Sequence, residues 1–480
     1  MVLNCPLNDA IRFVECGNCS MHSVQKFALA AVARGISGLY LWRFWDYFGG
    51  EMHGFSYKSG SLHCEEVDLK TLAASYGTPL YVYSGGTITD HFRRLDEALS
   101  GVPHEIAYAV KANSNLSVLR LLAAQGAGFD IVSGGELFRV LKAGGDPAHC
   151  TFAGVGKTRA EIIYALNEGI YSFNVESEEE LRYLNQVAGE LGLIAPAAVR
   201  VNPNVDAKTH KYISTGKSEN KFGVDFEAIV DLYERASKEL PHIRLRGLQM
   251  HIGSQLTSIA PFIEAVEKVT PLVRLLKQRH GIEFWSIGGG IGIVYHNSLE
   301  SGAAGWWQQR EGSDAPLTIE RYGKELVPRL KDLGLKILLE PGRYIVGNAG
   351  VLLTRCLYEK KGLAKTFKIV DAGMNDLIRP ALYEGHHEIV PLTEPVSGER
   401  VMVDVVGPIC ESGDFFCQDR ELSDFQPGEC VALMSAGAYG FAMASNYNSR
   451  PLPAEVLVEG ATARIIRHRQ DFDSLIEGES

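Results

Sequence analysis

Cysteine is scarce in this chain, and its distribution argues against a disulfide scaffold. The 480 residues include nine cysteines, an odd number without regular spacing, whereas disulfide-stabilised secreted domains carry dense, regularly spaced cysteines. We therefore expect a reducing, cytoplasmic location. Cys16, Cys19 and His22 form part of a zinc-site pattern, but one CxxC without a second ligand pair does not predict a metal centre. We expect no bound metal.

Excess positive charge and long apolar runs are missing as well. The 47 Lys and Arg residues stand against 58 Asp and Glu residues, a net charge of −11, which argues against nucleic-acid binding. The most apolar stretch, residues 27–42, contains Arg34 and is shorter than the roughly 20 residues that span a membrane. The pattern of a signal peptide is not found at the N-terminus. We expect neither a nucleic-acid nor a membrane partner.

From about residue 84, short β-branched runs alternate with longer amphipathic stretches. Helical spacing is found in residues 88–99, 116–124, 178–191 and 262–278. The eight runs that predict strands are Ile106–Val110, Phe129–Val132, Thr151–Ala153, Ser172–Val175, Ala198–Val201, Leu248–Ile252, Phe284–Ile287 and Lys336–Leu339. This alternation is typical of βα units around a parallel sheet, and eight strands predict a closed (β/α)8 barrel.

After Arg343 the pattern changes to strands separated by Gly, Pro and Asp turns, which predicts a mostly β C-terminal domain. Its predicted strands are residues 351–358, 366–370, 400–406, 430–434 and 454–458, and residues 80–83 are expected to join them. The expected division of the chain is an N-terminal extension of unknown role (1–51), leading strands packed with the β domain (52–83), the barrel (84–346) and the β domain (347–480).

Polar residues follow several of the predicted barrel strands, at the end where such barrels carry their active sites. Lys111 ends the first strand, Asp130 lies in the second, His251 ends the sixth and Glu340 ends the eighth. Gly288–Gly290 follow the seventh. A lysine, two acids, an imidazole and an anion-binding loop are therefore expected at one mouth of the barrel.

Each of these residues suggests a chemical role. Burial can lower the pKa of a strand-end lysine and free its amine to form a Schiff base with an aldehyde. Three glycines let backbone N–H groups approach a phosphate, and Ser254 could add a hydroxyl donor. The Glu340 carboxylate could face the nitrogen of a pyridine ring and keep it protonated, and His251 could stack on the face of that ring. Each residue taken singly also has an ordinary structural explanation. Lys111 could be a lysine that snorkels to solvent, the three glycines a tight turn, Glu340 part of an ion pair, and His251 a core residue.

A set of longer motifs resembles one known family. The motifs are AYAVKAN around Lys111, HIGSQ at 251–255, GGGIGI from 288, EPGR at 340–343, DAGMNDLIRPALY at 371–383, CESGDFF at 410–416 and GAYGFAMASNYNSRPLPAEVLV from 437. Together they resemble the pyridoxal-phosphate decarboxylases of the alanine-racemase fold type, and among these the diaminopimelate decarboxylases. The resemblance covers about residues 57–466.

The resemblance implies residue roles. Lys111 would bind pyridoxal 5′-phosphate covalently, and Cys410 would return a proton to the substrate carbon. The other implied cofactor contacts are Asp130, His251, Ser254, Gly288, Gly289, Gly290, Glu340, Gly342, Arg343 and Tyr439. The implied substrate contacts are Arg343, Arg379, Tyr383, Glu411 and Tyr439, with the arginines and Tyr383 on the distal carboxylate and Glu411 on the distal ammonium. The family also implies a homodimer in which the CESGD segment reaches into the partner's pocket.

The activity implied by the resemblance is decarboxylation of meso-2,6-diaminopimelate to L-lysine and CO2, the last step of lysine biosynthesis. Two alternatives stay open. An ornithine or arginine decarboxylase of the same fold would need no carboxylate clamp. A non-catalytic pyridoxal-phosphate carrier would keep the lysine but need neither the second domain nor the proton donor. Residues 1–51 and 306–316 match no motif of the family.

Overall fold

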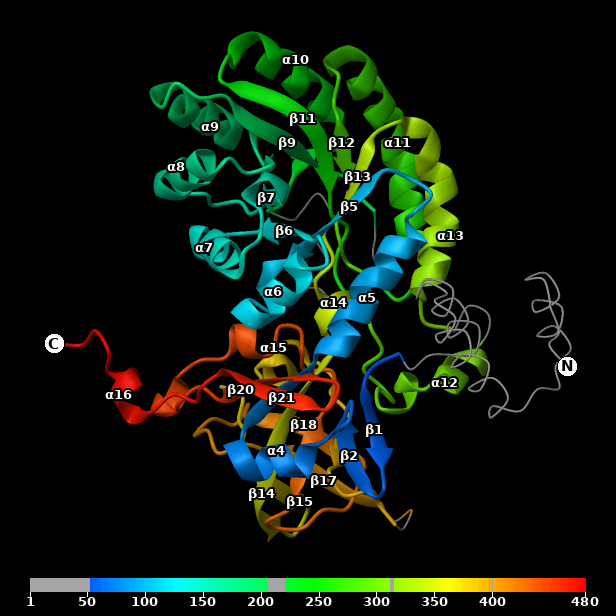
Figure 1. Ribbon diagram of the computed structural model, residues 1–480, viewed down its shortest axis with the longest axis vertical. Coiled ribbons are helices and arrows are strands. Elements are labelled where there is room, and N and C mark those ends of the chain that lie inside the picture. Colours follow the sequence, from blue (N-terminus) through cyan, green and yellow to red (C-terminus); the bar gives the residue numbers. More distant parts are fainter. Residues whose placement is uncertain (1–51, 206–220, 311–314, 397, 399) are drawn as a thin grey trace, which may run out of the picture.

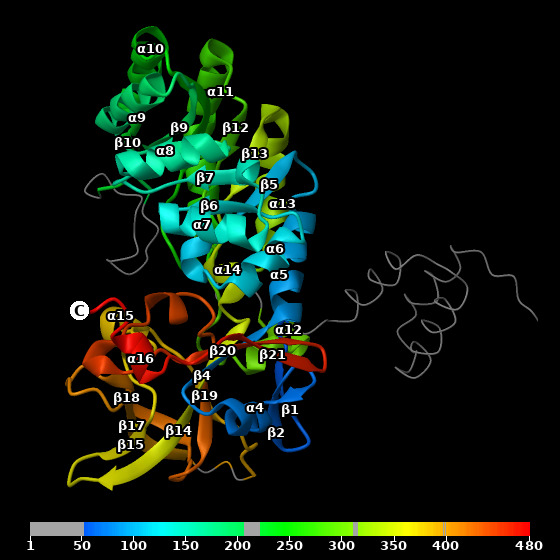
Figure 2. The same cartoon turned by 60° about the vertical axis from the view of Figure 1, so that its left-hand side comes forward.

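The computed structural model describes residues 52–205, 221–310, 315–396, 398 and 400–480. The N-terminal extension and the partial zinc pattern of Cys16, Cys19 and His22 lie outside these residues. Figures 1 and 2 show a barrel above and a mostly β domain below, with the chain passing between the two. In the described part of the chain, every helix is too short or too polar to cross a membrane.

The upper half is a closed barrel of eight parallel strands, as the sequence predicts. The strands are β5 (His104–Ala109), β6 (Gly128–Ile131), β7 (Cys150–Phe152), β8 (Ser172–Val175), β9 (Ala195–Asn202), β11 (Ile243–Met250), β12 (Phe284–Ser286) and β13 (Lys336–Leu339). Pairing of β13 with β5 closes the ring, and the short β10 (Val224–Asp225) adds to β9. Each predicted run overlaps one observed strand.

Helices cover the outside of the barrel (Figure 1). They are α5 (Gly85–Ala98), α6 (Leu116–Ala123), α7 (Gly134–Ala143), α8 (Arg159–Glu168), α9 (Glu178–Glu190), α10 (Ile229–Glu239), α11 (Ala260–His280) and α13 (Ile319–Leu330). The short α12 (Ala304–Gln308) lies lower, beside the β domain (Figures 1 and 2). Short polar side chains start several of these helices: Ser133 caps α7, Thr158 forms a capping box with Glu161 on α8, and Ser177 caps α9. These caps satisfy N–H groups that would otherwise lack partners, and so fix where each strand-to-helix loop ends.

The lower half is built on a second sheet that the sequence predicts only in part. Its strands are β4 (Leu80–Ser84), β14 (Gly350–Lys361), β15 (Thr366–Val370), β16 (Ile389–Pro391), β17 (Arg400–Val406), β18 (Phe415–Ser423), β19 (Cys430–Leu433), β20 (Ala454–Glu459) and β21 (Thr462–Arg467). Strand β4 lies between β14 and β20, as expected for residues 80–83. The sequence pattern does not predict β16, β18 or β21.

Smaller elements complete this half. A three-stranded sheet of β1 (Phe55–Lys58), β2 (Ser61–Cys64) and β3 (Val67–Asp68) precedes α4 (Leu69–Tyr76). Phe55, Leu62 and Leu72 share one apolar core with Val82 and Val351 of the large sheet. Burial of such side chains is the main stabilising contribution. Three short helices lie at the ends of loops: α14 (Arg343–Val346), α15 (Arg379–Tyr383) and α16 (Phe472–Leu475).

Candidate active site

A cavity of about 860 Å³ lies where the carboxyl ends of the barrel strands face the β domain. Two other cavities among the described residues are smaller, at about 340 and 40 Å³. Eleven of the predicted site residues line it: Lys111, Asp130, His251, Ser254, Gly290, Glu340, Gly342, Arg343, Arg379, Tyr383 and Tyr439. Residues from the carboxyl ends of five barrel strands and from the β domain therefore meet in one place, as expected for an α/β barrel.

Lys111 is part of an ion pair inside the cavity. Its Nζ atom lies 2.9 Å from Oδ2 of Asp130, which is buried in β6. Burial lowers the pKa of the lysine, but Asp130 and Tyr439 raise it by more, so that the net shift is upward. The expectation of a lowered pKa is therefore wrong, because the sequence does not show that Asp130 lies directly beside the amine.

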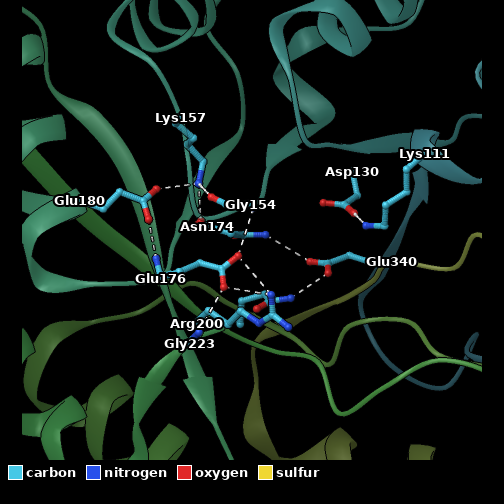
Figure 3. A network of polar contacts seen from close by, with 11 residues as sticks. Lys111, Asp130, Gly154, Lys157, Asn174, Glu176, Glu180, Arg200, Gly223 and Glu340 are labelled. Atoms are coloured by element: carbon cyan, nitrogen blue, oxygen red, sulfur yellow. Dashed lines mark hydrogen bonds and ion pairs between the residues drawn. The ribbon is translucent and has the colours of Figure 1, made fainter. Parts of the chain in front are cut away.

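Glu340 is held by a set of neutral donors (Figure 3). Its Oε1 atom accepts hydrogen bonds from Ser286 (2.7 Å) and Asn174 (3.3 Å), and Oε2 accepts one from Gln249 (2.8 Å). Burial, followed by the charge of Asp130, raises the pKa of this carboxyl group to about 7. Near neutral pH the group can therefore hold a proton or share one with a basic nitrogen in front of it.

Arg200 is a site residue that the sequence analysis missed. It lies on β9, lines the cavity, and donates from Nη1 to both carboxylate oxygens of Glu176 at 3.1 Å. Glu176 also accepts from the backbone N–H groups of Gly154 and Gly223, as Figure 3 shows. The Nη2 atom of Arg200 is buried without a partner among the described residues. The one charged residue in the otherwise apolar run AAVRVN could have indicated this role from the sequence.

Lys157 stabilises the same strand ends from behind. Its Nζ atom donates to the carbonyl oxygens of Gly154 (2.6 Å) and Asn174 (2.9 Å) and to Glu180 (2.7 Å). Glu180 in turn accepts from the backbone N–H of Glu176. Figure 3 shows these contacts as a continuous network that leads through Glu176 to Arg200 and through Asn174 to Glu340. The network holds Asn174 and Glu176 behind Glu340 and Arg200, which line the cavity.

The glycine loop after β12 packs too closely for any side chain. A Cβ atom on Gly288, Gly289 or Gly290 would lie 2.1–2.3 Å from a backbone oxygen, and Gly288 and Gly290 have φ values of +72° and +101°. Only glycine adopts such a path without strain. The N–H of Gly289 donates to Nδ1 of His251 at 3.3 Å. Burial, followed by Arg200 and Lys111, lowers the pKa of His251, so this ring is neutral.

Two buried arginines, Arg343 and Arg379, also line the cavity. Arg343 donates to the hydroxyl of Tyr295 (2.5 Å) and to Ser254 (3.1 Å), and its Nε atom is buried without a partner in the described residues. Arg379 donates from Nη1 to Nε2 of His387 at 2.6 Å. Their guanidinium groups lie 5.8 and 4.6 Å from the Tyr295 ring centre. Neither Tyr295 nor His387 was singled out from the sequence.

Tyr439 joins the β domain to the barrel. Its backbone N–H donates to the carbonyl oxygen of Ala112 (2.8 Å), and its φ of 56° turns the loop back toward the cavity. The guanidinium of Arg343 lies 5.0 Å from its ring centre. A Cβ on Gly342 would lie 3.0 Å from the side chain of Ala112, so that glycine leaves room for this approach.

Cys410 and Glu411 do not line the cavity of their own chain. Both are exposed, and the backbone N–H of Cys410 donates to Asn448 at 2.9 Å. The loop is tied down by Asp414, which accepts from the N–H groups of Met374 and Ile409, each at 2.6 Å. The structure therefore presents the predicted proton donor on an ordered, outward-facing loop.

Comparison with known proteins identifies the family. Residues 85–347 match the model of the pyridoxal-dependent decarboxylase, pyridoxal binding domain. The chain is 49% identical to diaminopimelate decarboxylase of Vibrio cholerae over 427 residues, covering 88% of this chain and 98% of the relative. The Aquifex aeolicus enzyme of the same name is 47% identical over 422 residues, covering 88% of this chain and 96% of that one. The chain belongs to the diaminopimelate decarboxylase family.

Solved structures agree with this assignment. Diaminopimelate decarboxylase from M. jannaschii in co-complex with L-lysine has a TM-score of 0.80 at 38% identity, covering 89% of this chain and 97% of that chain. The Helicobacter pylori enzyme complexed with L-lysine has a TM-score of 0.78 at 42% identity, covering 85% and 98%. The predicted fold class and family are thereby confirmed.

The cavity has the features that a pyridoxal-dependent member of the diaminopimelate decarboxylase family needs. Asp130 Oδ1, Arg200 Nη2 and Arg343 Nε are buried polar atoms without partners among the described residues, and unpaired buried polar atoms are costly unless a ligand satisfies them. Lys111 supplies an amine, and Glu340 supplies a carboxyl group with a pKa of about 7. The donor set therefore fits pyridoxal phosphate.

Proposed function

We propose that this chain decarboxylates meso-2,6-diaminopimelate to L-lysine and CO2 in the cavity described above, with pyridoxal 5′-phosphate as cofactor. The observation that carries the proposal is the pair of buried guanidinium groups, Arg343 and Arg379, in the same cavity as Lys111 and Glu340. A substrate with a second carboxylate, remote from the one that leaves, is what such a pair can recognise.

Six residues would hold the cofactor. Lys111 would bind its aldehyde carbon, Glu340 its ring nitrogen, and His251 would lie against the ring. Gly290, Ser254 and Arg343 would contact the phosphate, where small residues and a guanidinium allow close approach. When bound, the cofactor supplies an electron-withdrawing pyridinium ring that accepts the electron pair released by the departing CO2.

The chain's own groups would orient the substrate. Arg379 and Arg343 would bind the distal carboxylate, with Tyr383 and Tyr439 beside them, and hydrogen bonds to charged groups of this kind contribute about 1.5–3 kcal/mol each. Fixing the far end in this way selects which carboxylate lies next to the cofactor. The rigid network around Glu176 and Arg200 keeps the cavity wall in place during the reaction.

The remaining step is delivery of a proton to the carbon that has lost CO2. We assign it to the Cys410 thiol of the second copy in a homodimer, with Glu411 on the distal ammonium. Support for this assignment is the outward-facing loop, which leaves both side chains away from their own cavity. A pocket built from two copies of the same chain is a natural consequence of two-fold symmetry.

The competing activities differ at the distal carboxylate. Ornithine and arginine lack that group, and the two guanidinium groups would face nothing that they bind well. A panel of diaminopimelate, ornithine and arginine, with CO2 release as readout, tests the choice. We expect release from diaminopimelate alone, whereas release from ornithine without release from diaminopimelate would refute the proposal. A bound cofactor with no turnover of any substrate would instead favour the carrier.

A further inference from the structure

The partners of Arg379 are unusual for a buried cation. The residue is 7% exposed, and among the described residues no carboxylate lies within ion-pair distance of its guanidinium group. Its guanidinium group instead contacts the imidazole of His387 at 2.6 Å and the face of the Tyr295 ring at 4.6 Å. Burial of a cation without an anionic partner is costly, which is the state expected of a group that waits for an anionic ligand.

The proton positions on His387 follow from its neighbours. Its Nδ1 lies 2.8 Å from the carbonyl oxygen of Met434, which can only accept, so Nδ1 carries the hydrogen. The Nε2 atom faces Nη1 of Arg379, which can only donate, so Nε2 must be an unprotonated acceptor. The ring is therefore neutral. His387 itself is completely buried, and Arg420 donates to its carbonyl oxygen at 2.6 Å.

A neutral acceptor has a property that a carboxylate lacks. A carboxylate would orient the guanidinium but also cancel its charge and compete with a ligand, whereas imidazole orients it and leaves the charge intact. Tyr295 completes the arrangement, because its hydroxyl accepts from Arg343 and its ring contacts both guanidinium groups. The Tyr295 ring also meets His387 edge-on, with centroids 5.5 Å apart.

We propose that His387 is a positioning residue that aims the Arg379 guanidinium at the distal carboxylate of the substrate through a neutral hydrogen bond, with Tyr295 setting the spacing to Arg343. This inference rests on the proposed function, in which the two arginines bind that carboxylate. His387 touches neither substrate nor cofactor in this arrangement, so it sets selectivity for the carboxylate and leaves the chemistry at the other end of the substrate unchanged.

The test compares two inhibitors that differ only by the carboxylate. L-Lysine and 1,5-diaminopentane are measured as competitive inhibitors of diaminopimelate decarboxylation by the holoenzyme. We expect wild-type protein to prefer L-lysine. His387→Leu should lower this preference about tenfold or more, the value of one charge-assisted hydrogen bond. His387→Gln, whose amide can both accept and donate, should stay within about threefold of wild type.

Further readouts separate positioning from general damage. In His387→Leu the KM for diaminopimelate should rise while kcat changes little. The matched control is His91→Leu, because His91 is another buried histidine with two backbone partners, Ile345 and Met52, outside the cavity. It should lose stability without losing the preference. If His387→Leu does not fold, Tyr295→Phe, which removes one hydroxyl group, is expected to lower the preference about threefold.

The outcomes distinguish the two levels of the argument. If wild-type protein prefers L-lysine and His387→Leu prefers it equally, His387 has no positioning role, and the proposed function stands. If wild-type protein does not distinguish the two inhibitors, the carboxylate clamp is wrong, and both proposals fall. Equal loss of preference in His387→Leu and His91→Leu would also overturn the positioning role.

Discussion

Replacing Glu340 with glutamine is expected to stabilise the cofactor-free protein above pH 7 while lowering its activity. The carboxyl group is buried among Ser286, Gln249 and Asn174, and burial and Asp130 raise its pKa to about 7. An amide fits the same space. Gln249 Oε1 and Asn174 Oδ1 are buried without partners in the described part of the chain, and a flip of either amide would turn an acceptor toward the new NH2 group.

The sign of the effect follows from the two pKa values. In the unfolded chain the carboxyl group loses its proton near pH 4.5, whereas in the folded protein it keeps the proton until about pH 7. Ionisation therefore costs the folded state free energy that grows between these values and reaches about 3 kcal/mol above pH 7. Glutamine does not ionise. The advantage of Glu340→Gln should be small at pH 5 and largest at pH 8.

The assay is the midpoint of thermal unfolding of the cofactor-free proteins between pH 5 and 8.5. Glu320→Gln is the matched control. Burial alone would raise the pKa of Glu320, but the ion pair with Arg94 lowers this pKa by more. The ionised Glu320 therefore stabilises the folded protein above the ordinary pKa of glutamate, and this stabilisation is lost in acid. This variant should show no advantage that grows with pH. An equal stability difference between Glu340→Gln and wild type at pH 5 and pH 8 would refute the reasoning.

With cofactor, Glu340→Gln should lower kcat about 10- to 150-fold.

Four other predictions concern the site and the chain ends. Lys111→Ala should abolish the borohydride-reducible linkage between cofactor and protein, and a remaining lysine adduct would show that another lysine binds the cofactor. Arg379→Gln should raise the KM for diaminopimelate about tenfold or more with a smaller change in kcat, and an unchanged KM would contradict the clamp. Mixing Lys111→Ala with Cys410→Ala chains should restore up to about a quarter of the pockets, because half of the dimers are mixed and each has one intact pocket; no recovery despite subunit exchange would place both residues in one chain's pocket. A chain that starts at Met52 should stay active, and a loss of activity would give residues 1–51 a structural role.

The sequence predicts the barrel well because its strands are short apolar runs at regular intervals, and because polar residues follow them at one end. Lys111, Asp130 and Glu340 were found for that reason. Arg200 was missed because it lies inside a strand, where one charged residue among apolar neighbours does not show which way it points. The resemblance to the family supplied Arg379, which no local pattern distinguishes from a surface arginine.

Other features depend on contacts that only the fold creates. Tyr295 belongs to the barrel and His387 to the β domain. The Tyr295 ring packs against Arg379 and His387 only because two loops from different halves of the molecule meet. The upward pKa shift of Lys111 has the same origin, since Asp130 comes from the neighbouring strand. Trp306 and Arg310, within the segment 306–316 that matches no family motif, also line the cavity and stack at 3.6 Å.

The most direct test of the proposed function is decarboxylation of meso-diaminopimelate that carries a 13C label in one carboxylate at a time. The two carboxylates are chemically equivalent except for their stereocentres, so only a site that fixes the distal one can distinguish them. We expect label at the D-centre to be released as CO2 and label at the L-centre to remain in L-lysine. Release of both labels in equal amounts, or no release while ornithine is decarboxylated, would contradict it.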